Sequence, residues 1–175
     1  MRKHNIEAFN SAYRIILFCM LTFVFVSCQR NSDMQGEGEV FLQGSWTTES
    51  VPNQDQLLRY ELIDFRFNCD SVFVKIKTYS KAKMDVDSCY GNGEWAEYAR
   101  GVYSVRGDSL IVQATYTNEN WRQKLSGCHH IGQYLPRFKI VKQTKDSLYL
   151  ENRFSHNPVQ LRKTETTTCV PQKVY

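Results

Sequence analysis

The 175-residue sequence lacks any run of Lys and Arg, and its formal net charge is only +4. Nucleic-acid-binding proteins carry clustered basic residues, so we expect no nucleic-acid partner. The chain also lacks long segments with the 3.6-residue apolar repeat of an amphipathic helix, which argues against a helical bundle. Aromatic residues are abundant instead, at 13% of the chain. Because aromatic side chains favour pleated sheet, the composition indicates an all-β protein.

No apolar run is long enough to cross a membrane as a helix. The longest covers residues 15–26 (IILFCMLTFVFV), whereas a spanning helix needs about 20 apolar residues. Arg2, Lys3 and Arg14 precede this block, and a small residue follows it. This order is typical of a secretory signal peptide, so we expect residues 1–27 to be removed on export.

The end of this block resembles the lipobox of bacterial lipoproteins. The small residue Ser27 precedes Cys28, and Phe25 occupies the position where Leu is usual. The resemblance implies that Cys28 becomes the lipid-carrying N-terminus and that the protein is anchored to a membrane. Gln29 follows, where lipoproteins kept at the inner membrane usually carry Asp. This favours a cell-envelope protein at the outer membrane, on its periplasmic face or at the surface.

The segment after Cys28 is polar. Residues 29–39 (QRNSDMQGEGE) contain glycine and show no periodicity, which is typical of a flexible tether. What remains is the size of one compact domain. We therefore predict a signal peptide at 1–27, a lipidated Cys with its tether at 28–39, and a single domain at 40–175.

Four cysteines remain in that domain. An even number of cysteines in an exported domain predicts two disulfides. A metal site is the alternative, because Cys128, His129 and His130 are consecutive. Three adjacent side chains do not easily turn to one ion, and the usual C-x₂₋₄-C spacing is absent. We expect neither a metal nor a cofactor.

A β-hairpin pattern recurs three times in the domain. Asp70, Asp108 and Asp146 each begin an Asp-Ser pair and are separated by equal intervals of 38 residues. Asp and Ser favour turns, and apolar residues alternate on both sides of each pair, as in strands with one buried face. With flanking strands at 44–50 and 158–164, eight strands result, enough to close a barrel. We predict an all-β, antiparallel up-and-down eight-stranded barrel, with a short helix after the first strand at 52–58.

Strand direction decides the disulfide pairing. In an up-and-down barrel the three Asp-Ser turns lie at one end, and the long loops 80–93 and 118–132 lie at the other. Cys69 lies in the first turn, and the last strand returns Cys169 to the same end. The other two cysteines lie in the two long loops. The predicted pairs are Cys69–Cys169 and Cys89–Cys128.

The first strand carries Leu42-x-Gly44-x-Trp46, which is similar to the Gly-x-Trp opening of lipocalins. On the last strand, Arg162 is placed like the Arg that covers this Trp in that family. The resemblance implies a lipocalin-like barrel, although the C-terminal helix of lipocalins is missing here.

Small barrels are either filled by side chains or hold one small ligand. The candidate ligand-binding residues are aromatic positions on inward faces or near the long loops: Trp46, Tyr103, Tyr116 and Tyr134. An apolar cavity with a few hydroxyl groups suits a lipid, a pigment or an aromatic metabolite. The alternative is a non-enzymatic scaffold that binds an envelope protein. Its candidate residues are the aromatic side chains of the long loops, Tyr79, Tyr90, Trp95 and Trp121.

Most of residues 34–170 resembles a family of short lipoproteins from Gram-negative bacteria. The matching stretches are GEGEVFLQGSW, SVPNQDQLL, FNCDSVFV, GVYSVRGDSL, ATYTNENW, LSGCHHIGQYLP and DSLYLENRFSHNPVQL. Members often carry the name fumarate hydratase, which implies that activity. The chain has neither the Gly-Ser-Ser-x-x-Met-x-x-Lys-x-Asn loop nor the free cysteines for a cluster that fumarases use. We therefore predict a ligand-binding protein and not an enzyme.

Overall fold

The computed structural model describes residues 34–83, 87–154 and 158–173. The predicted signal peptide, Cys28 and the first part of the tether lie outside these residues. The strands are β1 (Gly44–Thr48), β2 (Arg59–Asn68), β3 (Ser71–Ser80), β4 (Glu94–Arg106), β5 (Ser109–Thr117), β6 (Gln133–Tyr134), β7 (Arg137–Gln143), β8 (Ser147–Asn152) and β9 (Pro158–Glu165). The helical elements are η1 (Gln54–Gln56), α2 (Asp87–Tyr90) and η2 (Gly91–Gly93).

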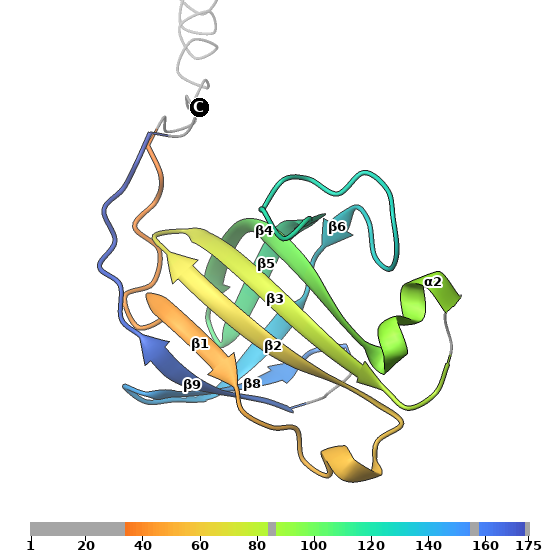
Figure 1. Cartoon of the computed structure of the whole chain (residues 1–175). Coiled ribbons are helices and arrows are strands. Elements are labelled where there is room, and N and C mark those ends of the chain that lie inside the picture. The colour runs from red at the N-terminus through yellow and green to blue at the C-terminus, as the bar shows by residue number, and fades with distance from the viewer. Residues whose placement is uncertain (1–33, 84–86, 155–157, 174–175) are drawn as a thin grey trace, which may run out of the picture. The chain divides into compact units, whose positions relative to one another are not determined.

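Eight of these strands close a barrel (Figure 1). Around it the order is β4, β3, β2, β1, β9, β8, β7, β5, and β5 pairs back with β4. Every neighbouring pair is antiparallel, and the two-residue β6 pairs with β5 beside β7. The predicted antiparallel eight-stranded barrel is confirmed. Closure leaves no sheet edge free among these eight strands, which removes a common site of unwanted strand pairing.

The short helix predicted after the first strand is not confirmed. The segment between β1 and β2 contains only the single 3-10 turn η1, and the α-helix α2 follows β3 instead. Short isolated helical segments are marginal in water unless tertiary packing stabilises them. None of the three η1 residues is buried, so packing does not stabilise a longer helix there.

The core follows the predicted alternation of strand faces. On β3 the inward-facing residues Val72, Val74 and Ile76 are all buried. Lys77, on the outward face, is exposed. The largest fully buried side chains are Trp46, Phe65, Phe67 and Phe138. Phe65 stacks on Phe67 and meets Phe138 edge to face, with 5.8 Å between the ring centroids of Phe65 and Phe138. The aromatic residues counted in the sequence therefore form much of the barrel interior.

Both predicted disulfides are confirmed: Cys69 pairs with Cys169, and Cys89 pairs with Cys128. The first lies at the end of the barrel that carries the three Asp-Ser turns, which we call the closed end. The second joins α2 to the long loop between β5 and β6, at the opposite end, which we call the mouth. The up-and-down strand order thus places each pair of cysteines together, as expected.

The closed end is filled by a hydrogen-bonded cluster. The Gln43 side chain donates to the Cys69 carbonyl at 2.9 Å and accepts from the Cys69 N–H at 2.7 Å. It also donates to the Tyr103 hydroxyl, which accepts a second bond from the Glu39 N–H. Gly38 passes close by with a φ of 67°, and a Cβ there would lie 2.0 Å from the Cys69 carbonyl oxygen. This position therefore requires glycine.

Part of the predicted tether lies in this cluster. Met34 forms a bridge with Lys173, and the Gln35 N–H donates to the Gln172 carbonyl. Figure 1 shows the two terminal segments side by side. Residues 34–39 are therefore held against the barrel, whereas residues 29–33 lie outside the described part of the chain.

Candidate functional site

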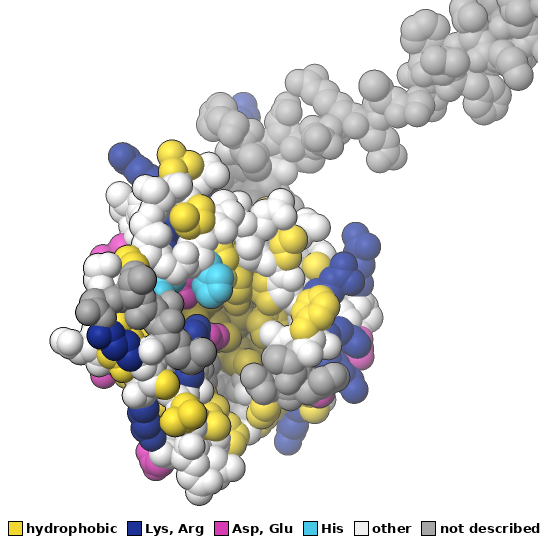
Figure 2. Space-filling model, turned by 90° about the vertical axis from the view of Figure 1, so that its right-hand side faces the viewer, with side chains coloured by type: hydrophobic (Ala, Val, Ile, Leu, Met, Phe, Trp, Pro, Cys, Tyr) yellow, Lys and Arg dark blue, Asp and Glu magenta, His cyan; other side chains and the backbone are white. Residues whose placement is uncertain are grey.

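The mouth of the barrel contains a hollow of about 600 Å³. Figure 2 shows this face, with hydrophobic side chains at the base of the hollow and charged side chains and histidine near its rim. Residues from the β1–β2 segment, β2, β7, β8 and β9 line it. The apolar part of the lining consists of Val51, Pro52, Leu57, Ile63, Phe138, Pro158 and Val159. A mainly apolar surface therefore opens to solvent at one end of the barrel.

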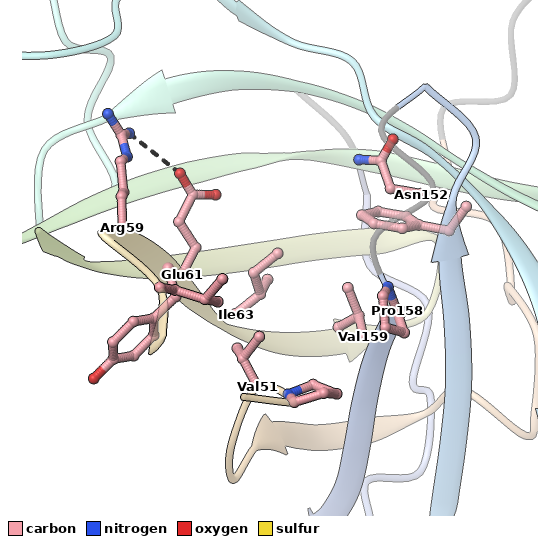
Figure 3. A pocket seen from close by; sticks show the side chains of 11 residues that line it. Val51, Arg59, Glu61, Ile63, Asn152, Pro158 and Val159 are labelled. Carbon is pink, nitrogen blue, oxygen red and sulfur yellow. Dashed lines mark hydrogen bonds and ion pairs between the residues drawn. The ribbon is translucent and has the colours of Figure 1, made fainter. Parts of the chain in front are cut away.

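An ion pair lies at one side of this hollow. Arg59, Glu61 and Ile63 are spaced two residues apart on β2. They therefore share the inward face of the strand, with Arg59 nearest the mouth. The Arg59 guanidinium lies 3.2 Å from the Glu61 carboxylate and 5.2 Å from the centre of the Trp95 ring. Figure 3 shows the pair on β2, with Pro158 and Val159 of β9 on the other side of the hollow. The site thus combines apolar walls with a charge-neutral polar edge.

A second carboxylate, that of Glu97, also lies at the mouth, and unlike Glu61 it is buried. The Glu97 side chain is only 4% exposed, and its Oε1 accepts a bond of 2.9 Å from the His130 N–H. His130 Nδ1 lies at the same distance from this oxygen. The His130 ring also stacks on Tyr116, which meets Tyr134 at 5.4 Å between centroids. The carboxylate, the imidazole and two phenols therefore form one contact group inside the mouth.

Burial raises the pKa values of both phenols in this group. The pKa of Tyr116 is raised to about 12, first by burial and then by the negative charges of Glu97 and Glu61. The pKa of Tyr134 is also raised, with burial as the main cause. Both phenols therefore remain protonated at neutral pH and can donate hydrogen bonds.

The loop between β5 and β6 lies at the mouth because two kinds of contact hold it there. The Cys89–Cys128 disulfide ties it to α2. The next residue, His129, stacks on Trp95 with 4.4 Å between ring centroids and an interplanar angle of 4°. Together with the His130–Glu97 bonds, these contacts attach the loop to β4 on the inner side of the barrel.

None of the four aromatic residues predicted to bind a ligand lines the hollow. Tyr116 and Tyr134 lie at the mouth, close enough to Glu61 for its charge to act on both. Tyr103 belongs to the closed-end cluster, and Trp46 is buried with its Nε1–H donating to the Leu42 carbonyl at 2.7 Å. Trp46 and Tyr103 therefore have structural contacts within the protein.

The expectation that Arg162 covers Trp46 is wrong, because the next residue, Lys163, covers the Trp46 ring instead. Lys163 Nζ lies 4.6 Å from the centre of the Trp46 ring, and the two residues are paired across β1 and β9. Lys163 also donates to the Phe41 and Gln43 carbonyls. Arg162 lies on the outward face and pairs with Glu49. Alternation along the strand explains the difference, since adjacent residues face opposite sides.

Replacing Lys163 by Met is expected to lower the free energy of unfolding by about 1–2 kcal/mol, because a cation–π contact and two hydrogen bonds are lost. The matched variant Arg162→Met removes only an exposed ion pair and is expected to cost less than about 0.5 kcal/mol. Urea unfolding of both variants measures the difference. Equal losses would contradict the assignment of Lys163 to the Trp46 ring.

Arg59, Glu61 and the β1–β2 segment line the hollow but were not among the predicted site residues. The signal for the first two was present in the sequence, since apolar residues alternate at Ile63, Phe65 and Phe67 before the first Asp-Ser pair. Extending the same alternation towards the start of the strand puts Glu61 and Arg59 on the same face.

The aromatic residues predicted to lie in the long loops have separate contacts. Tyr79 lies on β3 and stacks on Tyr60, and Trp95 lies on β4 and stacks on His129. Trp121 lies in the loop after β5 and meets Phe73.

The cysteine and histidine cluster shows no metal-binding arrangement. Cys128 is in a disulfide, and no group of three or more His, Cys, Asp or Glu residues that could hold an ion occurs in residues 34–83, 87–154 and 158–173. In those same ranges no helix is long and apolar enough to span a membrane.

No protein-family model, no curated protein and no solved structure matches this chain.

Proposed function

We propose that this protein is a cell-envelope lipoprotein that binds a small, mainly apolar molecule in the mouth of its barrel, and that it acts by binding and not by catalysis. The observation that carries the proposal is the hollow of about 600 Å³. Sites for small molecules typically measure about 300–1,000 Å³ and are lined mainly by apolar side chains with a few polar groups. The mouth has this size and this composition.

The position of the hollow also supports a binding role. Its apolar walls come from segments far apart in the sequence, with Val51 before β2 and Val159 on β9. Phe138 belongs to the buried core, and Ile63 packs against that core. The base of the hollow is therefore fixed by the barrel. A site on rigid strands can present the same surface to each ligand molecule without a large ordering cost.

The resemblance to lipocalins supports the proposed binding role. The barrel is closed at one end around Trp46, which a lysine side chain covers, and it is hollow at the other end. An anchor on Cys28 would reach the barrel through residue 34, which lies at the closed end beside Lys173. In this arrangement the mouth stays clear of the anchored end, and a ligand can enter from the surrounding fluid.

A second candidate function, binding of an envelope protein, is favoured by the outer face of the barrel. Trp121 meets Phe73 and Tyr98 at 5.1 and 5.6 Å between ring centroids. The Arg66 guanidinium lies 4.3 Å from the Phe73 ring centre, and Arg100 lies at 5.5 Å. Trp, Tyr and Arg are the residues that dominate protein interfaces. Loss of a crosslinked partner in Trp121→Ala, with ligand binding unchanged, would support this candidate.

The ligand-binding proposal is tested by filling the hollow. Replacing Ile63 by Trp adds a large side chain at its base, and we expect binding of the fluorescent apolar probe N-phenylnaphthylamine to fall at least about tenfold. The matched control is Val102→Trp, since Val102 is 45% exposed on β4. That variant is expected to bind the probe as the parent does. Equal probe binding in all three proteins, or none in the parent, would contradict the proposal.

A further inference from the structure

The charged part of the hollow lies on one strand. Arg59 and Glu61 are the charged residues among those that line it, and both belong to β2. Most of the apolar lining comes from other segments, including Val51, Phe138 and Val159. Figure 3 shows the two charged groups together, apart from the apolar side chains of Val51 and Val159. A molecule that fills the hollow therefore meets charge on one side and apolar surface on the other.

The Arg59–Glu61 pair can accept a third partner. One contact of 3.2 Å joins Arg59 Nη2 to Glu61 Oε1, and in the described part of the chain it is the only hydrogen bond of either side chain. A guanidinium has several N–H donors, and a carboxylate has several acceptor sites. The two side chains are 36% and 43% exposed. Donors of Arg59 and acceptor sites of Glu61 therefore remain accessible to a molecule in the hollow.

A ligand group with a single charge meets a like charge at this pair. An anion that binds the Arg59 guanidinium would lie beside the Glu61 carboxylate and be repelled by it. A cation that binds Glu61 would lie beside Arg59 and be repelled in the same way. Because the two protein groups are only 3.2 Å apart, no ligand charge can approach one without the other. A head group of one sign thus gains an attraction and a repulsion together.

A head group that carries both charges avoids this repulsion. Its anionic part can accept hydrogen bonds from Arg59, and its cationic part can lie against the Glu61 carboxylate. Charges of opposite sign then face each other at both contacts, and charge-assisted hydrogen bonds are stronger than neutral ones. The existing pair loses little when it rearranges, because partly exposed ion pairs contribute little to stability.

We propose that the molecule bound in the mouth is a zwitterionic amphiphile, with its anionic group on Arg59, its cationic group on Glu61 and its apolar chain at the base of the hollow beside Ile63 and Phe138. The inference rests on the proposed ligand-binding function and adds the chemical class of the ligand. The apolar chain accounts for the apolar lining, and the paired charges of the head group account for the two charged residues that share that lining.

The test uses four molecules that share one dodecyl chain, each kept below its micelle concentration. N-dodecyl-N,N-dimethylglycine is a zwitterion, dodecanoate an anion, dodecyltrimethylammonium a cation, and dodecanol is uncharged. Each competes with N-phenylnaphthylamine for the full chain, and the Ile63→Trp variant serves as the blank. We expect the zwitterion to compete about tenfold better than dodecanol and better than either ion.

A fifth competitor distinguishes two sources of this chemistry, a membrane lipid and a soluble amphiphile. Lauroyl-lysophosphatidylethanolamine carries a zwitterionic lipid head group on an acyl chain of the same length. Tighter binding of this molecule than of N-dodecyl-N,N-dimethylglycine indicates a lipid, and weaker binding indicates a soluble amphiphile with a compact head group. Both results support a zwitterionic ligand, provided that the zwitterions compete better than the single-charge molecules.

Two variants separate the charges of the pair. Glu61→Gln leaves the Arg59 charge alone and should bind dodecanoate best, whereas Arg59→Gln leaves the Glu61 charge alone and should bind dodecyltrimethylammonium best. In both variants the zwitterion is expected to lose its advantage of about tenfold, while dodecanol is unchanged. The matched control is Arg162→Gln, because Arg162 forms an exposed pair with Glu49 at 2.6 Å and does not line the hollow. This control should leave all affinities as in the parent.

The outcomes separate this inference from the proposed function. Equal competition by the zwitterion and dodecanol, or tighter binding of either ion to the parent, overturns the zwitterion inference and leaves the binding function standing. The inference also fails if the folded variants Glu61→Gln and Arg59→Gln keep the parent's order of affinities. If the parent protein does not bind N-phenylnaphthylamine, both the proposed function and this inference fail.

Discussion

Replacing both Cys69 and Cys169 by Ala is expected to lower the free energy of unfolding by about 4–5 kcal/mol. The disulfide joins residues 100 positions apart, and the entropy gained by the unfolded chain when such a loop is opened accounts for roughly that amount. Folded domains are typically stable by only about 5–15 kcal/mol, so the variant is expected to be near unfolding. Urea unfolding at neutral pH, without reductant, measures the loss.

Alanine is the appropriate replacement at this turn. Cys69 has a φ of 55°, a conformation in which any Cβ is unfavourable. Because alanine keeps the Cβ, the variant changes the cross-link and not the backbone preference, whereas glycine would relieve the strain and hide part of the loss.

The Cys89–Cys128 pair provides the matched comparison. Its sequence separation is 39, so the chain-entropy model predicts a loss of about 4 kcal/mol, only slightly smaller. Cys69 is fully buried in the closed-end cluster, whereas both cysteines of the second pair are only partly buried. We therefore expect the double alanine variant at the mouth to be the more stable of the two. The reverse order would show that the closed end contributes less to folding than its contacts indicate.

The barrel could be predicted from the sequence because its signals are local and repeat. Three Asp-Ser turns and period-two alternation define successive hairpins, and the up-and-down strand order follows from short connections between them. Strand direction then places four cysteines at two ends, which is why both disulfides could be predicted. The helix expected at 52–58 was not predicted correctly. These seven residues have no buried face, so only weak local preferences decide their conformation.

The candidate site was less predictable, for a physical reason. Alternation tells which face of a strand a residue occupies, but not which atoms it meets inside a closed barrel. Trp46 and Tyr103 are inward, as expected, yet their polar atoms bond to Leu42, Glu39 and Gln43 within the protein. The β1–β2 segment lines the hollow opposite β9 only because the sheet closes, and no local pattern encodes that approach.

Alkaline pH is expected to destabilise the folded protein strongly between about pH 10 and 12. The pKa values of Tyr103 and Tyr116 are each raised from 10 to about 12, with burial as the main cause. In that window the unfolded chain loses the protons of these two phenols and of Tyr134, whose pKa is also raised by burial, while the folded protein keeps them. The stability is therefore fully present below pH 10 and is lost as the pH rises through 12, by about 3 kcal/mol per tyrosine. Urea midpoints measured across this range test the expectation.

The variant Tyr103→Phe distinguishes the contribution of the closed-end phenol Tyr103 to the alkaline loss of stability from that of the mouth phenol Tyr116. The variant leaves the Glu39 N–H without its acceptor, so at pH 7 we expect it to be less stable than the parent by about 1–3 kcal/mol. Between pH 10 and 12 it has one raised phenol fewer, and its loss of stability should be smaller by about 3 kcal/mol. The two proteins are thus expected to have similar stability near pH 12. The control Tyr149→Phe replaces an exposed tyrosine and should follow the parent at every pH. A Tyr103→Phe curve parallel to that of the parent throughout would show that burial of this phenol does not govern the alkaline transition.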